Sequence, residues 1–212
     1  RAIEVLRGRQ LSSRAVELGE QALDLLGSSR FQPTSDVLLA MAELLFSVGA
    51  EDRGASMLAR ARGLNDRGPL HEARFRRLLG AAEAASGRLD EAAELLGSSA
   101  EGFEAGGRPW DRAAALDALG DVHLAAGDLE LALDVRRRQL AALESLGDEP
   151  RRRVSVLGHL GSVLSALDRD DEAMACRQAA LEGAETLDDE HLVAAVRGEV
   201  ARLLAERGEL DR

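Results

Sequence analysis

The sequence repeats one pattern of small and apolar residues at an interval of about 40 residues. Between residues 109 and 187 two copies follow one another closely. The first copy contains Pro109, Leu119-Gly120, Gly127 and Ala132, and the second contains Pro150, Leu160-Gly161, Asp168 and Ala173. Self-similarity of this kind is typical of proteins in which each copy buries its apolar face against the next. The sequence therefore predicts a repeat scaffold whose outer surface holds a partner.

Turn and start signals agree on the phase of the repeat. One turn per copy falls at residues 49, 87, 127, 168 and 208, and all of these are glycine except Asp168. A helix often ends on a left-handed residue, a conformation that glycine adopts at little cost. Pro69, Pro109 and Pro150 mark helix starts, where the missing N–H is harmless. Pro33, followed by Thr34-Ser35-Asp36, predicts a further helix start with side-chain caps. Two helices per copy are expected.

The composition favours helices throughout. Aromatic residues make up 2% of the chain, tyrosine is absent, and alanine, leucine, glutamate and arginine dominate. We expect an all-α fold formed by one array over residues 1–212, cut from a longer protein. The expected copies are residues 1–30 (partial), 33–66, 69–106, 109–147, 150–187 and 189–212 (partial).

The repeated residues resemble the tetratricopeptide repeat. Gly-Arg-Leu-Asp-Glu-Ala at 87–92 and Gly-Asp-Leu-Glu-Leu-Ala at 127–132 are similar to that family's turn and close-packing alanine. The Leu-Gly pairs at 79–80, 119–120 and 160–161 match its first helix. The usual period of 34 residues is exceeded here, as in kinesin-light-chain-like proteins and bacterial regulators. The resemblance implies a right-handed superhelical solenoid of antiparallel helix pairs with a concave groove lined by the first helices.

Carried onto this sequence, the resemblance implies a partner-binding groove rather than a catalytic site. Its expected lining or border residues are Glu43, Phe46, Arg74, Arg77, Asp117, Asp121, His159, Ser162 and Arg202. Arginines in one copy and aspartates in the next predict a ligand segment with acidic and basic ends.

Motifs for catalysis, metals or cofactors are missing from the sequence. Without lysine there is no phosphate-binding loop, and the four histidines lie far apart along the chain. Cys176 occupies the repeat position of Met57, Leu95 and Val135, which predicts packing rather than nucleophilic chemistry. His123 is likewise expected to pack, and Trp110 to brace a helix start. The arginine runs 136–138 and 151–153 are expected to form a solvated face paired with acids. We therefore expect no enzyme, cofactor or metal site.

Charge narrows the class of partner. The net charge of −11 disfavours nucleic acid, and no apolar run approaches the ~18 residues of a membrane span. A single cysteine is compatible with the cytosol, and the use of arginine alone as basic residue fits a high-GC bacterial genome. We expect a cytoplasmic protein- or peptide-binding scaffold region of a larger bacterial signalling or regulatory protein. The alternatives are an effector-sensing domain of a transcription regulator and a face that packs against another domain of the same polypeptide.

Overall fold

A computed structural model describes residues 14, 16–19, 21, 33–64, 68–147, 150–187 and 189–206, and these ranges contain helices and turns but no strand. The chain divides into two compact units, Arg1–Gly102 and Phe103–Arg212. Unit 1 contains α2 (Ser35–Ser47), α3 (Glu51–Arg62) and α4 (Pro69–Ala85), and α5 (Leu89–Ala105) runs from unit 1 into unit 2. Unit 2 continues with α6 (Pro109–Ala126), α7 (Leu129–Glu144), α8 (Pro150–Ala166), α9 (Asp170–Glu185) and α10 (Glu190–Glu206). The all-α prediction is confirmed.

The predicted turns have the predicted backbone. Gly49, Gly87 and Gly127 have φ angles of 75°, 78° and 83°. Asp168 has a φ of 57°, and no other non-glycine residue in the described ranges has a positive φ. The repeat thus imposes a left-handed turn even where glycine is missing, and an aspartate tolerates that conformation better than most residues.

Prolines mark the helix starts, with one difference from expectation. Pro69, Pro109 and Pro150 are each the first residue of a helix. Pro33 instead precedes α2 by two residues, and the N-cap Thr34 makes no side-chain capping hydrogen bond. Asp189 does cap its helix: its Oδ1 accepts hydrogen bonds from the amides of His191 and Leu192, both at 3.1 Å.

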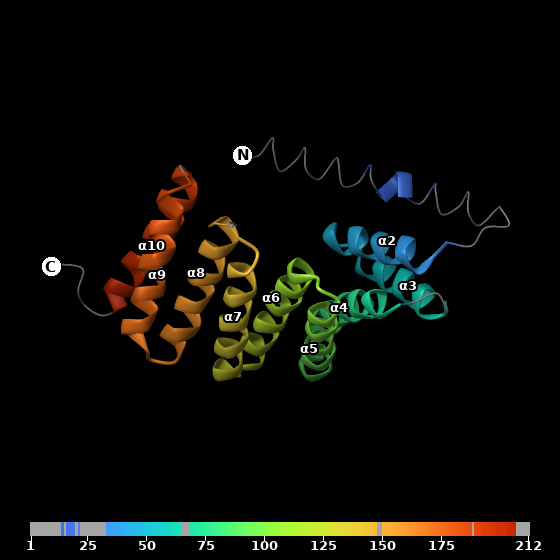
Figure 1. The fold of residues 1–212 in the computed structure, drawn as a ribbon, viewed down its shortest axis with the longest axis horizontal. Helices are drawn as coiled ribbons and strands as arrows, with labels where there is room; N and C mark the ends of the chain where they lie inside the picture. The colour runs from blue at the N-terminus through green and yellow to red at the C-terminus, as the bar shows by residue number, and fades with distance from the viewer. Residues whose placement is uncertain are drawn as a thin grey trace. The chain divides into compact units, whose positions relative to one another are not determined.

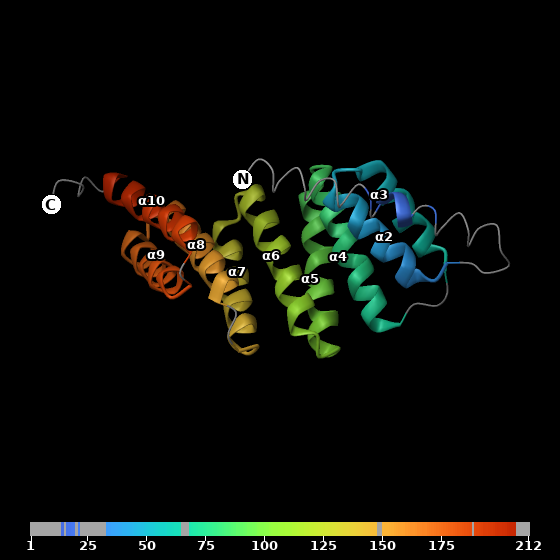
Figure 2. The ribbon, with the colours of Figure 1, turned by 90° about the horizontal axis from the view of Figure 1, so that it is seen from above.

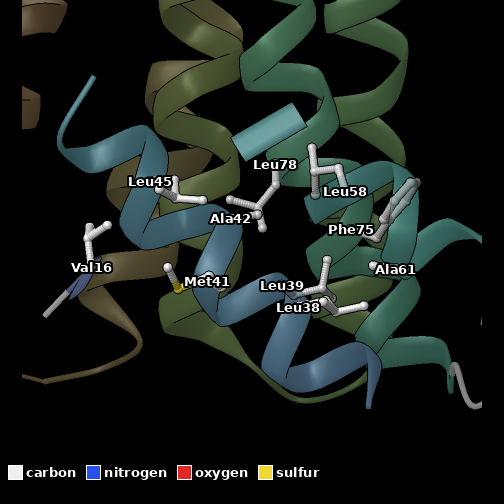
Figure 3. Close-up of a cluster of buried hydrophobic side chains, with 10 residues drawn as sticks. All are labelled: Val16, Leu38, Leu39, Met41, Ala42, Leu45, Leu58, Ala61, Phe75 and Leu78. Carbon is white, nitrogen blue, oxygen red and sulfur yellow. The ribbon is translucent and has the colours of Figure 1, made fainter. Parts of the chain in front are cut away.

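Unit 1 has its core between α2, α3 and α4. Figure 3 shows side chains such as Leu38, Leu45, Leu58 and Phe75 converging there, and all are buried. Small residues permit the close approach of α4 and α5, because a β-carbon at Gly80 would lie 2.8 Å from Leu96 Cγ. Such packing of leucine onto glycine holds α4 and α5 together.

Unit 2 is also built from neighbouring antiparallel helices. Figure 1 shows α6 beside α7 and α8 beside α9, and Figure 2 shows α10 beside α9. The close-packing alanines Ala132 and Ala173 are fully buried, as is Ala92 in unit 1. Their predicted role at the contacts between paired helices is confirmed.

The two ends of the chain carry expectations that lie outside the described residues. These are the helix end over 1–7, most of the helix over 11–26, and the turn at Gly208. Val16 is described, and it is buried against the core of unit 1 (Figure 3).

Candidate functional site

The first helix of each pair carries the residues that the repeat register assigns to partner binding. We call these residues the first-helix face. Unit 1 contributes Glu43, Phe46, Arg74 and Arg77 from α2 and α4. Unit 2 contributes Asp117, Asp121, His159, Ser162 and Arg202 from α6, α8 and α10.

In unit 1, one carboxylate joins two consecutive first helices. Glu43 on α2 accepts hydrogen bonds from Arg74 Nη2 at 2.7 Å and from Arg77 Nη2. Burial opposes ionisation of Glu43, but the hydrogen bonds and charges of Arg74 and Arg77 outweigh it and lower the pKa of this carboxyl. The neighbouring His71 Nε2 lies 2.6 Å from Asp36 Oδ2. The two predicted arginines are therefore already paired within the chain.

Phe46 has a structural contact that the sequence did not predict. A β-carbon at Gly54 would lie 2.7 Å from Phe46 Cε1, so the ring lies on the backbone of α3. Phe46 is half-buried and packs against the core of unit 1. Its ring joins the two helices of its own pair.

In unit 2, both predicted aspartates bind a guanidinium from the second helix of their pair. Arg136 on α7 donates from Nη1 to Asp117 Oδ1 at 2.5 Å and from Nη2 to Asp121 Oδ1. Gln139 Nε2 donates to the same Asp117 oxygen at 2.9 Å. Two carboxylates face one guanidinium, so this cluster keeps one excess negative charge.

The expectation of a solvated arginine run is wrong for Arg136. This residue is 1% exposed, whereas Arg137 and Arg138 are exposed. The reason is space: Gly120 has no β-carbon, and one placed there would lie 2.7 Å from Arg136 Nε. Arg136 also occupies the repeat position of Leu58 and Leu96, both buried. That register was the signal in the sequence that could have identified it.

The remaining predicted residues of unit 2 are more open. His159 on α8 is half exposed, and its Nδ1 lies 3.9 Å from Asp117 Oδ1 on α6. Ser162 Oγ donates to the Gly158 carbonyl at 3.2 Å, and Arg202 is exposed on α10. Within unit 2 the structure thus brings Asp117, Asp121 and His159 together.

Other residues singled out in the sequence have mostly structural roles. Trp110 lies at the start of α6 and is 38% exposed, and the guanidinium of Arg152 lies 5.0 Å from its ring centroid. His123 is largely buried, with Nδ1 3.8 Å from Asp128 Oδ2. Cys176 is half-buried, and burial, followed by the charge of Glu172, raises the pKa of its thiol. A raised pKa disfavours the reactive thiolate.

The described ranges offer neither a metal-binding cluster nor a membrane-spanning helix. Those ranges contain no group of three or more histidine, cysteine or acidic side chains suited to a metal ion. None of their helices is both long and apolar enough to cross a membrane.

Solved structures share the fold at low sequence identity. No protein-family model and no curated protein sequence matches the chain. BtubC (BKLC) from P. vanneervenii is similar over 97% of this chain and 85% of its own, at 19% identity and a TM-score of 0.72.

Two further solved structures are also similar. One is a signal transduction ATPase with numerous domains and a tetratricopeptide repeat sensor, from Pyrococcus horikoshii. The match has 16% sequence identity and a TM-score of 0.73, and it covers 81% of this chain and 26% of that protein. The other is the Rap conjugation gene regulator of plasmid pLS20 in complex with the Phr* peptide. The match has 20% sequence identity and a TM-score of 0.67, and it covers 96% of this chain and 61% of that protein. The predicted resemblance is confirmed at the level of fold: the helix pairs of this chain are tetratricopeptide-like.

Proposed function

We propose that the chain is a protein- or peptide-binding scaffold region of a larger bacterial signalling or regulatory protein in the cytoplasm, and that it is not an enzyme. The observation that carries the proposal is the polar first-helix face. Consecutive first helices there share half-exposed charged groups, Glu43 with Arg74 in unit 1 and Asp117 with His159 in unit 2. Charged rims of this kind steer partners and set specificity.

The pairing of these charges refines the expected partner. In unit 1, Glu43 offsets part of the positive charge of Arg74 and Arg77, so these arginines offer a partner less charge than the sequence suggests. In unit 2, Asp121 is 65% exposed in its side chain and belongs to a cluster with an excess negative charge. A segment that crosses α6 is therefore expected to bring a basic or N–H-donating group.

The second candidate is an effector-sensing domain of a transcription regulator. It is favoured by the likeness to a conjugation gene regulator solved with a peptide and to a protein with a tetratricopeptide repeat sensor. A flanking domain of the same polypeptide is a further possible occupant of the face. The net charge of −11 opposes direct binding to nucleic acid, and we propose no membrane partner and no cofactor.

A displayed library of random peptides tests the proposal. Selected peptides should bind the parent chain and lose affinity for His159→Ala and Arg202→Glu, which alter open positions of the first-helix face. Asp134→Arg is the matched control, because Asp134 is exposed on the second helix α7. Peptides that bind all four proteins equally, or bind only the control poorly, would contradict the proposal.

A further inference from the structure

We propose that Arg177 is a recognition residue for a carboxylate carried by the partner, placed beneath the first-helix face of α8. The proposal rests on the peptide-binding function above and names one chemical group that the partner must present.

Arg136 and Arg177 occupy the same position of their repeats. Each follows the close-packing alanine by one helical turn, Ala132 on α7 and Ala173 on α9, and each is buried, at 1% and 2% exposure. Each side chain lies on the glycine of its partner helix. A β-carbon at Gly120 would be 2.7 Å from Arg136 Nε, and one at Gly161 would be 3.0 Å from Arg177 Cγ and 3.4 Å from its Nε. Both side chains therefore lie on the glycine of the paired helix, with Nε and Cζ closest for Arg136 and Cγ closest for Arg177.

Their partners differ completely. The positions of Asp117, Asp121 and Gln139, which bind Arg136, are occupied by Gly158, Ser162 and Ala180 in the repeat of Arg177. Within the part of the chain that the structure describes, Arg177 makes one hydrogen bond, from Nη1 to Ser165 Oγ at 3.0 Å, and its buried Nε has no partner. Among the described residues no carboxylate oxygen lies within ion-pair distance of it. The repeat of Arg177 thus has no counterpart of the two aspartates that bind Arg136 in the previous repeat.

A buried guanidinium without an anion is a costly arrangement, since burial disfavours a charge unless it is paired and hydrogen-bonded. An incoming carboxylate would occupy the place that Asp117 and Asp121 fill beside Arg136. Gly158 and Ser162 are both partly exposed on α8 and have short side chains where the previous repeat has aspartates. The planar fork of a guanidinium matches the two oxygens of a carboxylate. The Ser162 hydroxyl, which donates to the Gly158 carbonyl in the free chain, can turn and donate to the carboxylate instead.

One acidic neighbour sets the charge pattern of the ligand. Glu199 Oε2 on α10 would be 3.6 Å from a β-carbon at Gly158. Glu199 is too far from Arg177 to form an ion pair, so it flanks the site without neutralising it. We therefore expect the partner to carry, close to its carboxylate, a basic or N–H-donating group that meets Glu199.

The direct test follows the side-chain Nε–H resonance of Arg177 by NMR. Three probes are titrated: acetyl-aspartate amide for a side-chain carboxylate, acetyl-alanine for a chain terminus, and inorganic phosphate. We expect a saturable shift of Arg177 with one or both carboxylates and none for Arg136, which serves as the internal control. The carboxylate probe that binds more tightly identifies the partner's group as a side chain or a chain terminus. No shift, or a shift with phosphate alone, would overturn the proposal.

Substitutions at Ser162 make the test specific. Ser162→Asp restores the aspartate that the previous repeat has, and we expect it to abolish the shift and raise the melting temperature. Ser162→Asn has nearly the same size without the charge, and the shift should persist. Equal responses of the two variants would overturn the proposal. So would a fall in melting temperature with Glu199→Gln, because it would show that Glu199 supplies the anion itself.

The peptides selected for the parent chain separate this inference from the proposed function. We expect Ser162→Asp to weaken their binding by about tenfold or more, since a desolvated charge pair is lost. Peptides that bind Ser162→Asp as tightly as the parent would overturn the role of Arg177 but leave peptide binding intact. A library that yields no peptide, with the Arg177 shift present, would instead contradict only the proposed function.

Discussion

The guanidinium of Arg136 lies directly on the backbone of Gly120: a β-carbon at residue 120 would be 2.7 Å from Nε and 2.9 Å from Cζ. The glycine makes room for a buried cation, and the cation in turn binds the two aspartates of the same first helix. A residue that the repeat uses for packing thus also fixes the charges of the first-helix face. The same position in the preceding repeat, Gly80, makes room for the leucine side chain of Leu96 instead.

Gly120→Ala is expected to destabilise the fold by about 1–3 kcal/mol, because the added methyl group overpacks the contact with Arg136. Thermal or urea unfolding measures the change. Gly198→Ala is the matched control: residue 198 also lies within a helix of unit 2, and its β-carbon would meet nothing within 4 Å. Alanine should stabilise that helix by up to about 1 kcal/mol. Equal effects at the two positions would contradict the proposed contact.

The left-handed turns permit a second prediction, on backbone conformation alone. Gly127 has a φ of 83°, and a β-carbon there would have open space around it. Gly127→Val is therefore expected to cost about 1–2 kcal/mol through the backbone and nothing through packing. At Asp168, with a φ of 57°, the expected sign is opposite: Asp168→Gly should raise the melting temperature and Asp168→Val should lower it. Unchanged melting of all three variants would contradict this assignment.

The fold was predictable because its signals are local. Glycine and proline each indicate the backbone conformation at their own positions, and together they establish the register of the repeat. That register also predicts the left-handed turn at Asp168, which the residue type alone does not indicate. The close-packing alanines follow from the same register.

The charge pairs of the first-helix face were not predictable in the same way. Glu43 meets Arg74 and Arg77 across two repeats, and such pairs depend on how successive helices are offset. The prediction of a solvated run fails at Arg136 because three consecutive helical residues point to different sides of the helix, and Arg136 is the one that faces the paired helix. Comparison with Leu58 and Leu96 separates the buried arginine from the two exposed ones.

The difference within that run gives a third prediction. Arg136→Met is expected to cost about 1–3 kcal/mol, because Asp117 and Asp121 lose their charge-assisted hydrogen bonds but remain hydrated at 47% and 65% side-chain exposure. Arg138→Glu changes an exposed residue and should alter the free energy of unfolding by less than about 0.5 kcal/mol. Urea unfolding compares the two variants with the parent. A large loss in Arg138→Glu, or none in Arg136→Met, would restore the interpretation of a uniformly solvated run.

At acid pH, protonation of Glu43 should lower the stability of unit 1. Hydrogen bonds and charges from Arg74 and Arg77, acting against burial, lower the pKa of this carboxyl below its ordinary value of 4.5. A group whose folded pKa is lowered contributes stability that is fully present above the ordinary value and is lost as pH falls through the lowered one. Glu43→Gln should therefore destabilise the protein near neutral pH and flatten its loss of stability below about pH 4.5.

Urea unfolding of parent and variant from neutral to acid pH measures this dependence, and only the difference between the two curves counts, since other carboxyls such as Asp189 contribute to both. Glu101→Gln removes an exposed glutamate of α5 and serves as the control. It should leave the shape of the acid transition unchanged. If Glu43→Gln and Glu101→Gln gave parallel curves, the carboxylate of Glu43 would not be held by the two arginines in solution, and Arg74 and Arg77 would be free to bind an acidic partner with their full charge.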